Sequence, residues 1–304
     1  MPTSAGKIVD LVPQIQEDFH VPGTLRGRSA AEACRTSQTW KQAKNVLSVS
    51  LQAGQGLRRL PNQLLQKARF PKMQRIVVMN PKGGSGKTTI AINLASYFAS
   101  RQQTPVLMDF DPQGSSLRWV KKRQAPQPPI HVIAAFEKDS RTTRAFQLRV
   151  PDSATHVIVD TPAAVESRAM PDITKDADKI LVPVLPSDID IHACSRCIRD
   201  LLLVAKIRRE DNRIGVIANR VRRNTLTYQT LIRFLQTLGI PIVATIRDSQ
   251  NYVRAAELGI GVHEMKSYVA AEDVEQWQPL VEWLEQPSGA RASSQAPPPA
   301  IVTA

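Results

Sequence analysis

Cysteine is scarce in this chain of 304 residues, which contains only Cys34, Cys194 and Cys197. Three thiols cannot form the paired framework of a small disulfide-stapled domain. Long apolar runs are missing as well, since no stretch approaches the ~20 consecutive apolar residues of a membrane-spanning helix. The first residues also lack the apolar core of a signal peptide. We therefore expect a cytoplasmic protein without a membrane span.

Acidic residues are also few, because 27 Asp and Glu stand against 40 Lys and Arg. The formal net charge is +13 and the pI is near 10.0, which favours a polyanionic partner such as nucleic acid or an anionic membrane. More than half of the excess precedes residue 75, since residues 1–74 contain 11 Lys or Arg and 4 Asp or Glu. With 42% hydrophobic residues, the chain is long enough for one large domain or two small ones.

Residues 1–74 are expected to be a basic N-terminal extension, partly helical or disordered. Prolines and glycines interrupt the first 30 residues, and a capping-box pattern at Ser29 precedes a possible helix between Ala30 and Leu51. One interpretation is a small extension that contacts DNA phosphates. The other, which we favour, is a solvated and partly disordered basic arm.

The most informative stretch lies between a strand signal and a helix signal. Ile76 to Met79 are apolar and indicate a short buried strand, and Ile90 to Ala99 follow a helical apolar pattern. The sequence Lys-Gly-Gly-Ser-Gly-Lys-Thr-Thr between them matches a phosphate-binding loop, with Asn80 or Pro81 in place of the first glycine of the usual spacing. Glycines let the loop turn its N–H groups toward phosphate oxygens, and the following helix adds its positive dipole end. The expected nucleotide-binding residues are therefore Gly83, Gly84, Ser85, Gly86, Lys87, Thr88 and Thr89.

Three further polar positions point to the chemistry of this site. Lys87 is expected to neutralise the β- and γ-phosphates, and Thr88 to offer its hydroxyl to Mg²⁺. The apolar strand signal of residues 156–159 ends in Asp160. A buried carboxylate is costly unless it is paired or lies near a cation, so Asp160 is expected to bind a water of Mg²⁺.

Another strand signal, from Pro105, ends in Asp109 and Asp111, which precede a Pro-Gln-Gly turn. Alternate residues of a strand point to the same face, so both aspartates can face one ligand. Parallel sheets bind ligands beyond the carboxyl ends of their strands. We therefore expect both carboxylates close to the nucleotide.

Strand and helix signals alternate from Ile76 onward. This pattern predicts an α/β fold with a doubly wound, mostly parallel sheet and helices on both faces, as in P-loop NTPases. The domain is expected to span residues 75–286, with a long helix from Ile189 to Ile207 and a closing helix over residues 271–285. Residues 287–304 are rich in proline, serine and alanine and are expected to form a disordered tail.

The phosphate loop and the aspartate motifs resemble those of the ParA/MinD superfamily of deviant Walker A ATPases, and most of all its short plasmid-type and orphan ParA proteins. In that family the lysine that corresponds to Lys82 reaches across a dimer interface to the partner's nucleotide. The resemblance implies that Asp111 directs the attacking water and that Asp109 supports the Mg²⁺ shell. It also implies that Asn219, at the end of a later strand, binds adenine. Lys82, Lys87 and Asp111 are thus the expected catalytic residues.

The resemblance also implies a function. It predicts a Mg²⁺-dependent ATPase that forms a homodimer on ATP, binds DNA non-specifically on the nucleoid, and positions a plasmid, chromosome or protein cargo. A ParB-like or cargo-adaptor protein would stimulate hydrolysis. Compact family members begin near the position of Met73, so the arm before it could be an upstream translation artefact. The basic residues expected to contact DNA, besides that arm, are Arg220, Arg222, Arg223 and Arg247.

Two other functions within the superfamily stay open. A MinD-like regulator would cycle on membranes through a basic amphipathic tail, but residues 287–304 contain several prolines and no apolar stripe, so we expect no membrane partner. An iron–sulfur carrier would use a C-x-x-C pair such as Cys194 and Cys197. These two thiols fall inside a predicted helix and fall short of the four ligands that a closed site needs, so we interpret them as core residues.

Overall fold

The computed structural model describes residues 73–137, 143, 147–222 and 224–288. The predicted N-terminal extension, over residues 1–74, and the predicted tail, over residues 287–304, lie almost entirely outside this part. Arg223 lies outside it as well.

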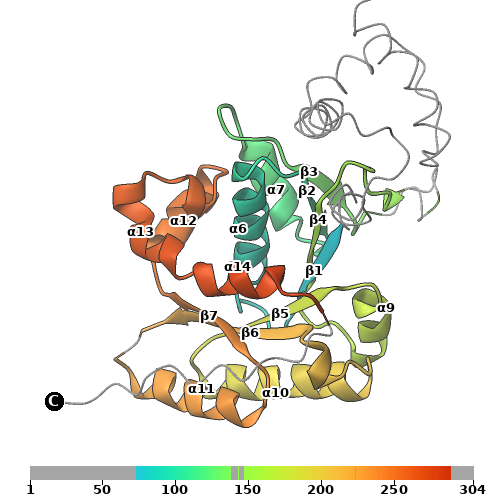
Figure 1. Ribbon diagram of the computed structural model, residues 1–304, viewed down its shortest axis with the longest axis vertical. Coiled ribbons are helices and arrows are strands. Elements are labelled where there is room, and N and C mark those ends of the chain that lie inside the picture. The colour runs from blue at the N-terminus through green and yellow to red at the C-terminus, as the bar shows by residue number, and fades with distance from the viewer. Residues whose placement is uncertain (1–72, 138–142, 144–146, 223, 289–304) are drawn as a thin grey trace, which may run out of the picture. The chain divides into compact units, whose positions relative to one another are not determined.

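Seven parallel strands form one sheet, in the spatial order β3-β2-β4-β1-β5-β6-β7 (Figure 1). The strand order reverses at β1, which lies between β4 and β5. Such a reversal opens a crevice beyond the carboxyl ends of the strands, where open α/β sheets bind ligands. The strands are β1 (Gln74–Val78), β2 (Pro105–Asp109), β3 (His131–Ala134), β4 (His156–Asp160), β5 (Lys179–Val184), β6 (Ile214–Val221) and β7 (Ile242–Arg247).

Helices cover both faces of the sheet, as the predicted fold class requires (Figure 1). One face carries α9 (Met170–Thr174), α10 (Asp188–Leu203) and α11 (Leu226–Thr237). The other face carries α6 (Lys87–Ser100), α7 (Ser115–Lys122), α12 (Gln250–Glu257), α13 (Ser267–Glu275) and α14 (Gln278–Glu285). Short 3₁₀ turns are η1 (Ser167–Ala169), η2 (Arg209–Asp211) and η3 (Val262–Glu264).

Side chains of the central strands alternate between two apolar cores. In β1, Ile76 and Val78 pack with residues of α6, whereas Val77 packs with residues of α10. All three side chains are fully buried, which explains why the strand is apolar throughout rather than alternating with polar residues. The phosphate loop therefore starts from a strand that is fixed on both faces.

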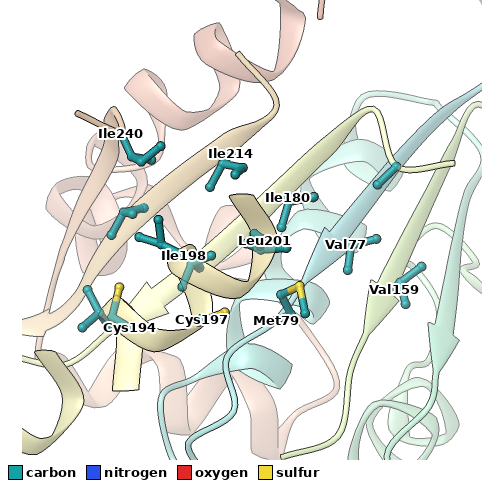
Figure 2. Packing of buried hydrophobic residues seen from close by; sticks show 14 of the residues in the cluster. Val77, Met79, Val159, Ile180, Cys194, Cys197, Ile198, Leu201, Ile214 and Ile240 are labelled. Atoms are coloured by element: carbon teal, nitrogen blue, oxygen red, sulfur yellow. The ribbon is translucent and has the colours of Figure 1, made fainter. Parts of the chain in front are cut away.

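Cys194 and Cys197 lie on the buried face of α10 and belong to the apolar core, as the sequence predicted (Figure 2). Both thiols are fully buried, near Met79 and Leu201 of the same cluster. Burial raises the pKa of Cys194 to about 12 and that of Cys197 further, so both remain neutral thiols. Neutral, buried thiols act as small apolar side chains and are poor metal ligands.

The helices differ from the sequence prediction in three places. The expected helix over 271–285 is two helices, α13 and α14, because Pro279 has no N–H and its ring clashes with the carbonyl of residue 275. Helix α10 ends at Leu203 rather than at Ile207. Helix α11 was not predicted at all, although Thr225 caps it by accepting a hydrogen bond from the Tyr228 N–H.

Candidate functional site

The phosphate loop connects the carboxyl end of β1 to the first residue of α6. Gly84 and Gly86 both have positive φ, 77° and 96°, a conformation that side chains disfavour. Gly86 has a second constraint, because a Cβ at this position would lie 2.1 Å from the Asn219 amide nitrogen. The loop therefore needs glycine at Gly86 both for its turn and for the approach of β6.

Asn80 anchors the start of the loop to the neighbouring strand. Its side-chain amide donates to the Pro183 carbonyl at 2.7 Å, and its Oδ1 accepts from the Lys82 N–H at 2.9 Å. Asn80 is fully buried, so both bonds form away from water. Asn80 therefore holds the backbone of Lys82 in place.

Lys87 lies at the N-terminus of α6 with its side chain folded back over the loop. It is nearly buried, and its Nζ donates to the Lys82 carbonyl at 3.1 Å. Burial lowers the pKa of Lys87, while the nearby carboxylates of Asp160 and Asp111 raise it in part. A buried ammonium that faces two carboxylates and a single carbonyl suits the binding of an anionic phosphate.

Lys82 has a partner that the sequence analysis missed. Its ammonium forms an ion pair with Asp190 of the same chain, in the first turn of α10. The Asp190 side chain is 2% exposed and the Lys82 side chain 32%. The Ser187 hydroxyl, which caps α10, also contacts the same carboxylate oxygen. The signal in the sequence was only a serine followed three residues later by an acid, which indicates a helix start and no partner.

The two aspartates after β2 have different surroundings. Asp109 is fully buried, and its carboxylate accepts from the Asp111 and Leu117 N–H groups, each at 3.0 Å. Burial raises the pKa of Asp109, although these backbone hydrogen bonds lower it in part. Asp111 is partly exposed and lines the cavity at the phosphate loop. Asp109 thus fixes the β2–α7 turn that presents Asp111; its part in a Mg²⁺ shell stays a prediction.

Asp160 at the end of β4 has the features of a metal-binding carboxylate. Its Oδ2 accepts from the Ser116 hydroxyl at 2.7 Å, and the Thr88 side chain lies close to this carboxylate. Its Oδ1 is buried and has no hydrogen-bond partner among the described residues. Burial raises the pKa of Asp160 to about 6. A buried oxygen without a partner is costly, and a hydrated cation beside Thr88 would satisfy it, so the residues present fit Mg²⁺.

Asn219 near the end of β6 reaches the phosphate loop directly. It is almost fully buried, and its amide donates to the Ser85 carbonyl at 2.9 Å. Its Oδ1 accepts from the Arg220 N–H at 3.0 Å. The side chain therefore lies at the loop, where the predicted adenine contact requires it, although the structure does not test that contact.

A cavity of about 600 Å³ joins these parts. The phosphate-loop residues Gly83, Gly84 and Gly86 form one wall together with the start of α6. Asp111 and Asn219 line it as well, whereas Lys82, Ser85, Asp109 and Asp160 are not among its lining residues. A further wall, which the sequence analysis missed, is the turn from β7 into α12 together with residues of that helix, and it includes Asp248, Ser249 and Tyr252.

The three described arginines that were predicted to contact DNA, Arg220, Arg222 and Arg247, form ion pairs with carboxylates. Arg220 and Arg222 both bind Asp248, at 3.2 and 3.1 Å, while their side chains stay 60% and 77% exposed. Arg247 forms ion pairs with Glu272 and Asp273 and is 33% exposed. Part of its charge is therefore compensated within the domain. The role of these arginines in DNA binding stays a prediction.

Two further findings concern the described residues alone. No helix within residues 73–288 is long and apolar enough to span a bilayer, as far as the structure describes them. In the same residues, no three His, Cys, Asp or Glu side chains gather as a metal-binding cluster. The expected Mg²⁺ site of Thr88, Asp109 and Asp160 stays a prediction.

The family model of the CobQ/CobB/MinD/ParA nucleotide-binding domain matches residues 76–262, which is more than half of the chain. The chain therefore belongs to this family of ParA/MinD-type nucleotide-binding ATPase domains. A "Maintenance of carboxysome distribution protein A" from Gloeobacter kilaueensis is 29% identical over 219 residues, which cover 71% of this chain and 95% of the relative. The chromosome-partitioning ATPase Soj from Thermus thermophilus is 53% identical over 45 residues, which cover 15% of this chain and 18% of the relative.

Solved structures show the same fold. Apo McdA from Cyanothece has a TM-score of 0.55 at 18% identity, and the match covers 70% of this chain and 99% of that one. A second McdA structure, solved as an ATP complex, has a TM-score of 0.54 at 17% identity, covering 74% of this chain and 100% of that one. MinD from Aquifex aeolicus has a TM-score of 0.54 at 18% identity, covering 69% of this chain and 97% of that one.

Proposed function

We propose that this protein is a Mg²⁺-dependent ATPase that positions a cargo by cycling between a monomer and an ATP-bound dimer on DNA. The observation that carries the proposal is the pair of lysines on one loop. Lys87 faces inward to the cavity, whereas Lys82 lies at the partly exposed edge and is paired only with Asp190 among the described residues. We infer that Lys87 binds the nucleotide of its own chain and that Lys82 can leave Asp190 to reach the nucleotide of a second chain.

The proposed division of labour follows from the geometry. Backbone N–H groups of the loop and the Lys87 ammonium would bind the phosphates, and Thr88 and Asp160 would hold Mg²⁺. Mg²⁺ would supply charge neutralisation at the β- and γ-phosphates. Asp111, at the cavity wall, orients the attacking water. Catalysis is then positioning and electrostatic stabilisation, with no covalent intermediate on the protein.

The proposed cargo and partners are inferred from the names of two relatives and from the charge of the chain. The name of the Gloeobacter relative refers to carboxysome distribution, and that of Soj to chromosome partitioning. We infer that the cargo here is a protein assembly, a plasmid or a chromosome carried over the nucleoid, and that a ParB-like or cargo-adaptor protein stimulates hydrolysis. The net charge of +13 supports DNA as the surface, through Arg220, Arg222, Arg223, Arg247 and residues 1–72.

The test is a DNA-binding titration with ATP or ADP, on the full chain and on a chain that starts at Met73. We expect ATP-dependent binding in both, because two copies of a basic surface act together in a dimer. The shorter chain should bind more weakly, with a shallower dependence on salt. Binding that ignores the nucleotide would contradict the proposed switch. Sedimentation with anionic vesicles in ATP would instead support a membrane-cycling protein.

A further inference from the structure

The Ser116 hydroxyl makes a hydrogen bond that the proposed function has not used so far. It donates to Oδ2 of Asp160 at 2.7 Å, across 44 positions of the chain. Both residues are fully buried, so water does not compete for this bond. The second oxygen of the same carboxylate, Oδ1, is buried and has no hydrogen-bond partner in the part of the chain that the structure describes. The bond therefore distinguishes the two oxygens, because one is held by the protein and the other is left for a ligand.

Backbone contacts fix the position of Ser116. It is the second residue of α7, and Gly114 before that helix has a positive φ of 62°. The Gly114 N–H donates to the Asp111 carbonyl at 2.8 Å. On the other side of Ser116, the Leu117 N–H donates to the Asp109 carboxylate at 3.0 Å. The position of the serine is thus set by its neighbours in the turn and the helix, independently of Asp160.

Strand pairing brings this turn to Asp160. Strands β2 and β4 are adjacent and parallel, and Asp109 lies opposite Asp160 at their carboxyl ends. The Phe110 N–H continues the pairing by donating to the Asp160 carbonyl at 3.0 Å. Helix α7 follows β2 closely in the chain, so Ser116 can reach the end of β4. Thr88, the second residue of α6, lies close to the same carboxylate. Three elements therefore meet at Asp160.

A carboxylate that supports a metal ion benefits from a fixed orientation. Its two oxygens are chemically equivalent, and rotation of the carboxylate group exchanges them. A donor on one oxygen selects one orientation, and loss of such a partner behind a metal ligand typically lowers metal affinity about 10- to 100-fold. A serine hydroxyl has a single O–H, and that of Ser116 is used for Oδ2 of Asp160. Ser116 thus has both the chemistry and the place to orient this carboxylate.

We propose that Ser116 is a positioning residue, which holds Asp160 so that the free oxygen of its carboxylate is available to a hydrated Mg²⁺ bound with the nucleotide. The inference rests on the proposed function, because it assigns a residue to the metal site of that ATPase. Ser116 is not among the residues that line the cavity, so it acts through Asp160 rather than on the nucleotide. Loss of its hydroxyl should weaken Mg²⁺ binding and leave metal-free nucleotide binding unchanged.

The test titrates Mg²⁺ into an excess of the full-length protein with bound mant-ADP, a fluorescent ADP analogue. It records the midpoint, which is the Mg²⁺ concentration at half of the fluorescence change. In Ser116→Ala the midpoint should rise at least about tenfold. The Kd of mant-ADP in EDTA should stay within about twofold of the wild type, since the phosphate loop is unchanged. Ser116→Cys has a similar size but a weaker donor, so its midpoint should fall between those of the wild type and Ser116→Ala.

Ser96→Ala is the matched control. The Ser96 hydroxyl is also fully buried, but it lies in the C-terminal half of α6 and has no hydrogen-bond partner among the described residues. Its midpoint should equal that of the wild type, and circular dichroism melts should show all three variants folded.

Hydrolysis gives a second readout that a merely structural role would not produce. In Ser116→Ala the Mg²⁺ concentration for half-maximal turnover should rise as the binding midpoint does. Turnover at saturating Mg²⁺ should stay within about threefold of the wild type, because the hydroxyl does not contact the nucleotide.

Two results would overturn this inference alone. The midpoint could be the same in the wild type and in Ser116→Ala. Turnover could also fall at every Mg²⁺ concentration with an unchanged midpoint, which would place the effect in the turn that carries Asp111. A wild type that hydrolyses ATP equally well in EDTA would instead contradict the proposed Mg²⁺-dependent function, and this inference with it.

Discussion

Two ion pairs of this domain, Lys82–Asp190 and Arg123–Glu264, join residues 108 and 141 positions apart in the chain, yet their surroundings differ. Arg123 and Glu264 are both 4% exposed. The guanidinium contacts both carboxylate oxygens and also donates to the Pro128 and Gly259 carbonyls. Glu264 in turn accepts from the Gly261 N–H at 2.9 Å. Every strong hydrogen-bonding group of this pair is therefore used.

The pair at the phosphate loop is less completely bonded. Lys82 is 32% exposed and contacts one oxygen of Asp190, while the other oxygen is buried without a hydrogen-bond partner among the described residues. A lysine with one exposed side can leave its carboxylate for another anion, whereas a buried bidentate arginine cannot without breaking the fold. The comparison indicates that Arg123–Glu264 holds α7 to η3, and that Lys82–Asp190 is a resting contact of the proposed switch.

The largest effect is expected from Arg123→Leu. Removal of one partner leaves the Glu264 carboxylate buried without its cation, so the free energy of unfolding should fall by about 3–5 kcal/mol. Arg208→Leu is the control, because the Arg208 side chain is 77% exposed and its loss from the pair with Asp211 should leave the free energy of unfolding nearly unchanged. Urea denaturation followed by circular dichroism measures both. If both variants lose the same free energy of unfolding, burial does not make the Arg123–Glu264 pair more important for stability than the Arg208–Asp211 pair.

Asp111→Ala should affect hydrolysis without affecting the fold. Loss of the side chain that orients water should lower ATP turnover about 100-fold, equivalent to about 2.7 kcal/mol in the barrier. ATP binding and dimerisation should persist, since the phosphate loop is unchanged. Single-turnover kinetics together with nucleotide-binding titrations decide this. Wild-type turnover, or loss of ATP binding, would remove Asp111 from its proposed role.

Acid should lower the free energy of unfolding through His263, which lies next to Glu264 between the rings of Tyr97 and Trp277. Burial lowers the pKa of His263 from 6.5 to about 4. Below pH 6.5 the unfolded chain therefore binds a proton that the folded chain does not, and the free energy of unfolding falls until about pH 4. We expect about 1–3 kcal/mol from this residue.

His263→Phe should remove that contribution, because phenylalanine keeps the ring and cannot be charged. Its free energy of unfolding should depend less on pH between 6.5 and 4 than that of the wild type. His192→Phe is the control, since the His192 side chain is 73% exposed. If the stability of His263→Phe depends on pH as that of the wild type does, folding does not lower the pKa of His263.

Lys82→Ala should weaken ATP-dependent dimerisation. It should also lower the free energy of unfolding by about 1–3 kcal/mol, because the Asp190 carboxylate, which is 2% exposed, loses its cation. ATP-dependent dimerisation, measured by light scattering in the Asp111→Ala background, should weaken at least about tenfold. Asp190→Asn should act in the opposite direction by releasing Lys82. If both variants dimerise like the parent, Lys82 has an ordinary surface role.

The smallest effect is expected at the arginines of the β6 and β7 ends. Arg222→Ala should reduce the salt slope of ATP-dependent DNA binding by about 0.9, the value for one phosphate contact. The side chain is 77% exposed, so stability should be unaffected. A titration at several salt concentrations gives the slope. An unchanged slope would remove Arg222 from the DNA surface.

The sequence predicted the fold and the phosphate loop because both depend on local patterns. Strand and helix signals alternate, and the glycines, Lys87 and Thr88 occur within one continuous stretch between a strand and a helix. Carboxylates that end strands could be assigned to the same edge for the same reason. The prediction of a single closing helix over residues 271–285 was wrong. The apolar pattern continues through Pro279, but this proline has no N–H to continue the hydrogen bonding of a helix.

Partners from distant parts of the chain could not be predicted. Nothing near Lys82 in the sequence indicates Asp190, and nothing near Arg123 indicates Glu264, since the strand order decides which loops meet. Nothing in the sequence near the phosphate loop indicates that the β7–α12 turn lines the same cavity. Arg247 was assigned to DNA by the family resemblance, and only the packing of α13 shows Glu272 and Asp273 beside it.

Asn219 has a consequence for the choice of nucleobase. A primary amide has two N–H donors and two acceptor lone pairs. One donor is used by the Ser85 carbonyl and one lone pair by the Arg220 N–H. One donor and one acceptor remain, which match the N7 acceptor and the N6 amino group of adenine. Guanine offers two acceptors, N7 and O6, along the same edge. For the proposed contact between Asn219 and the base, these internal bonds favour adenine over guanine.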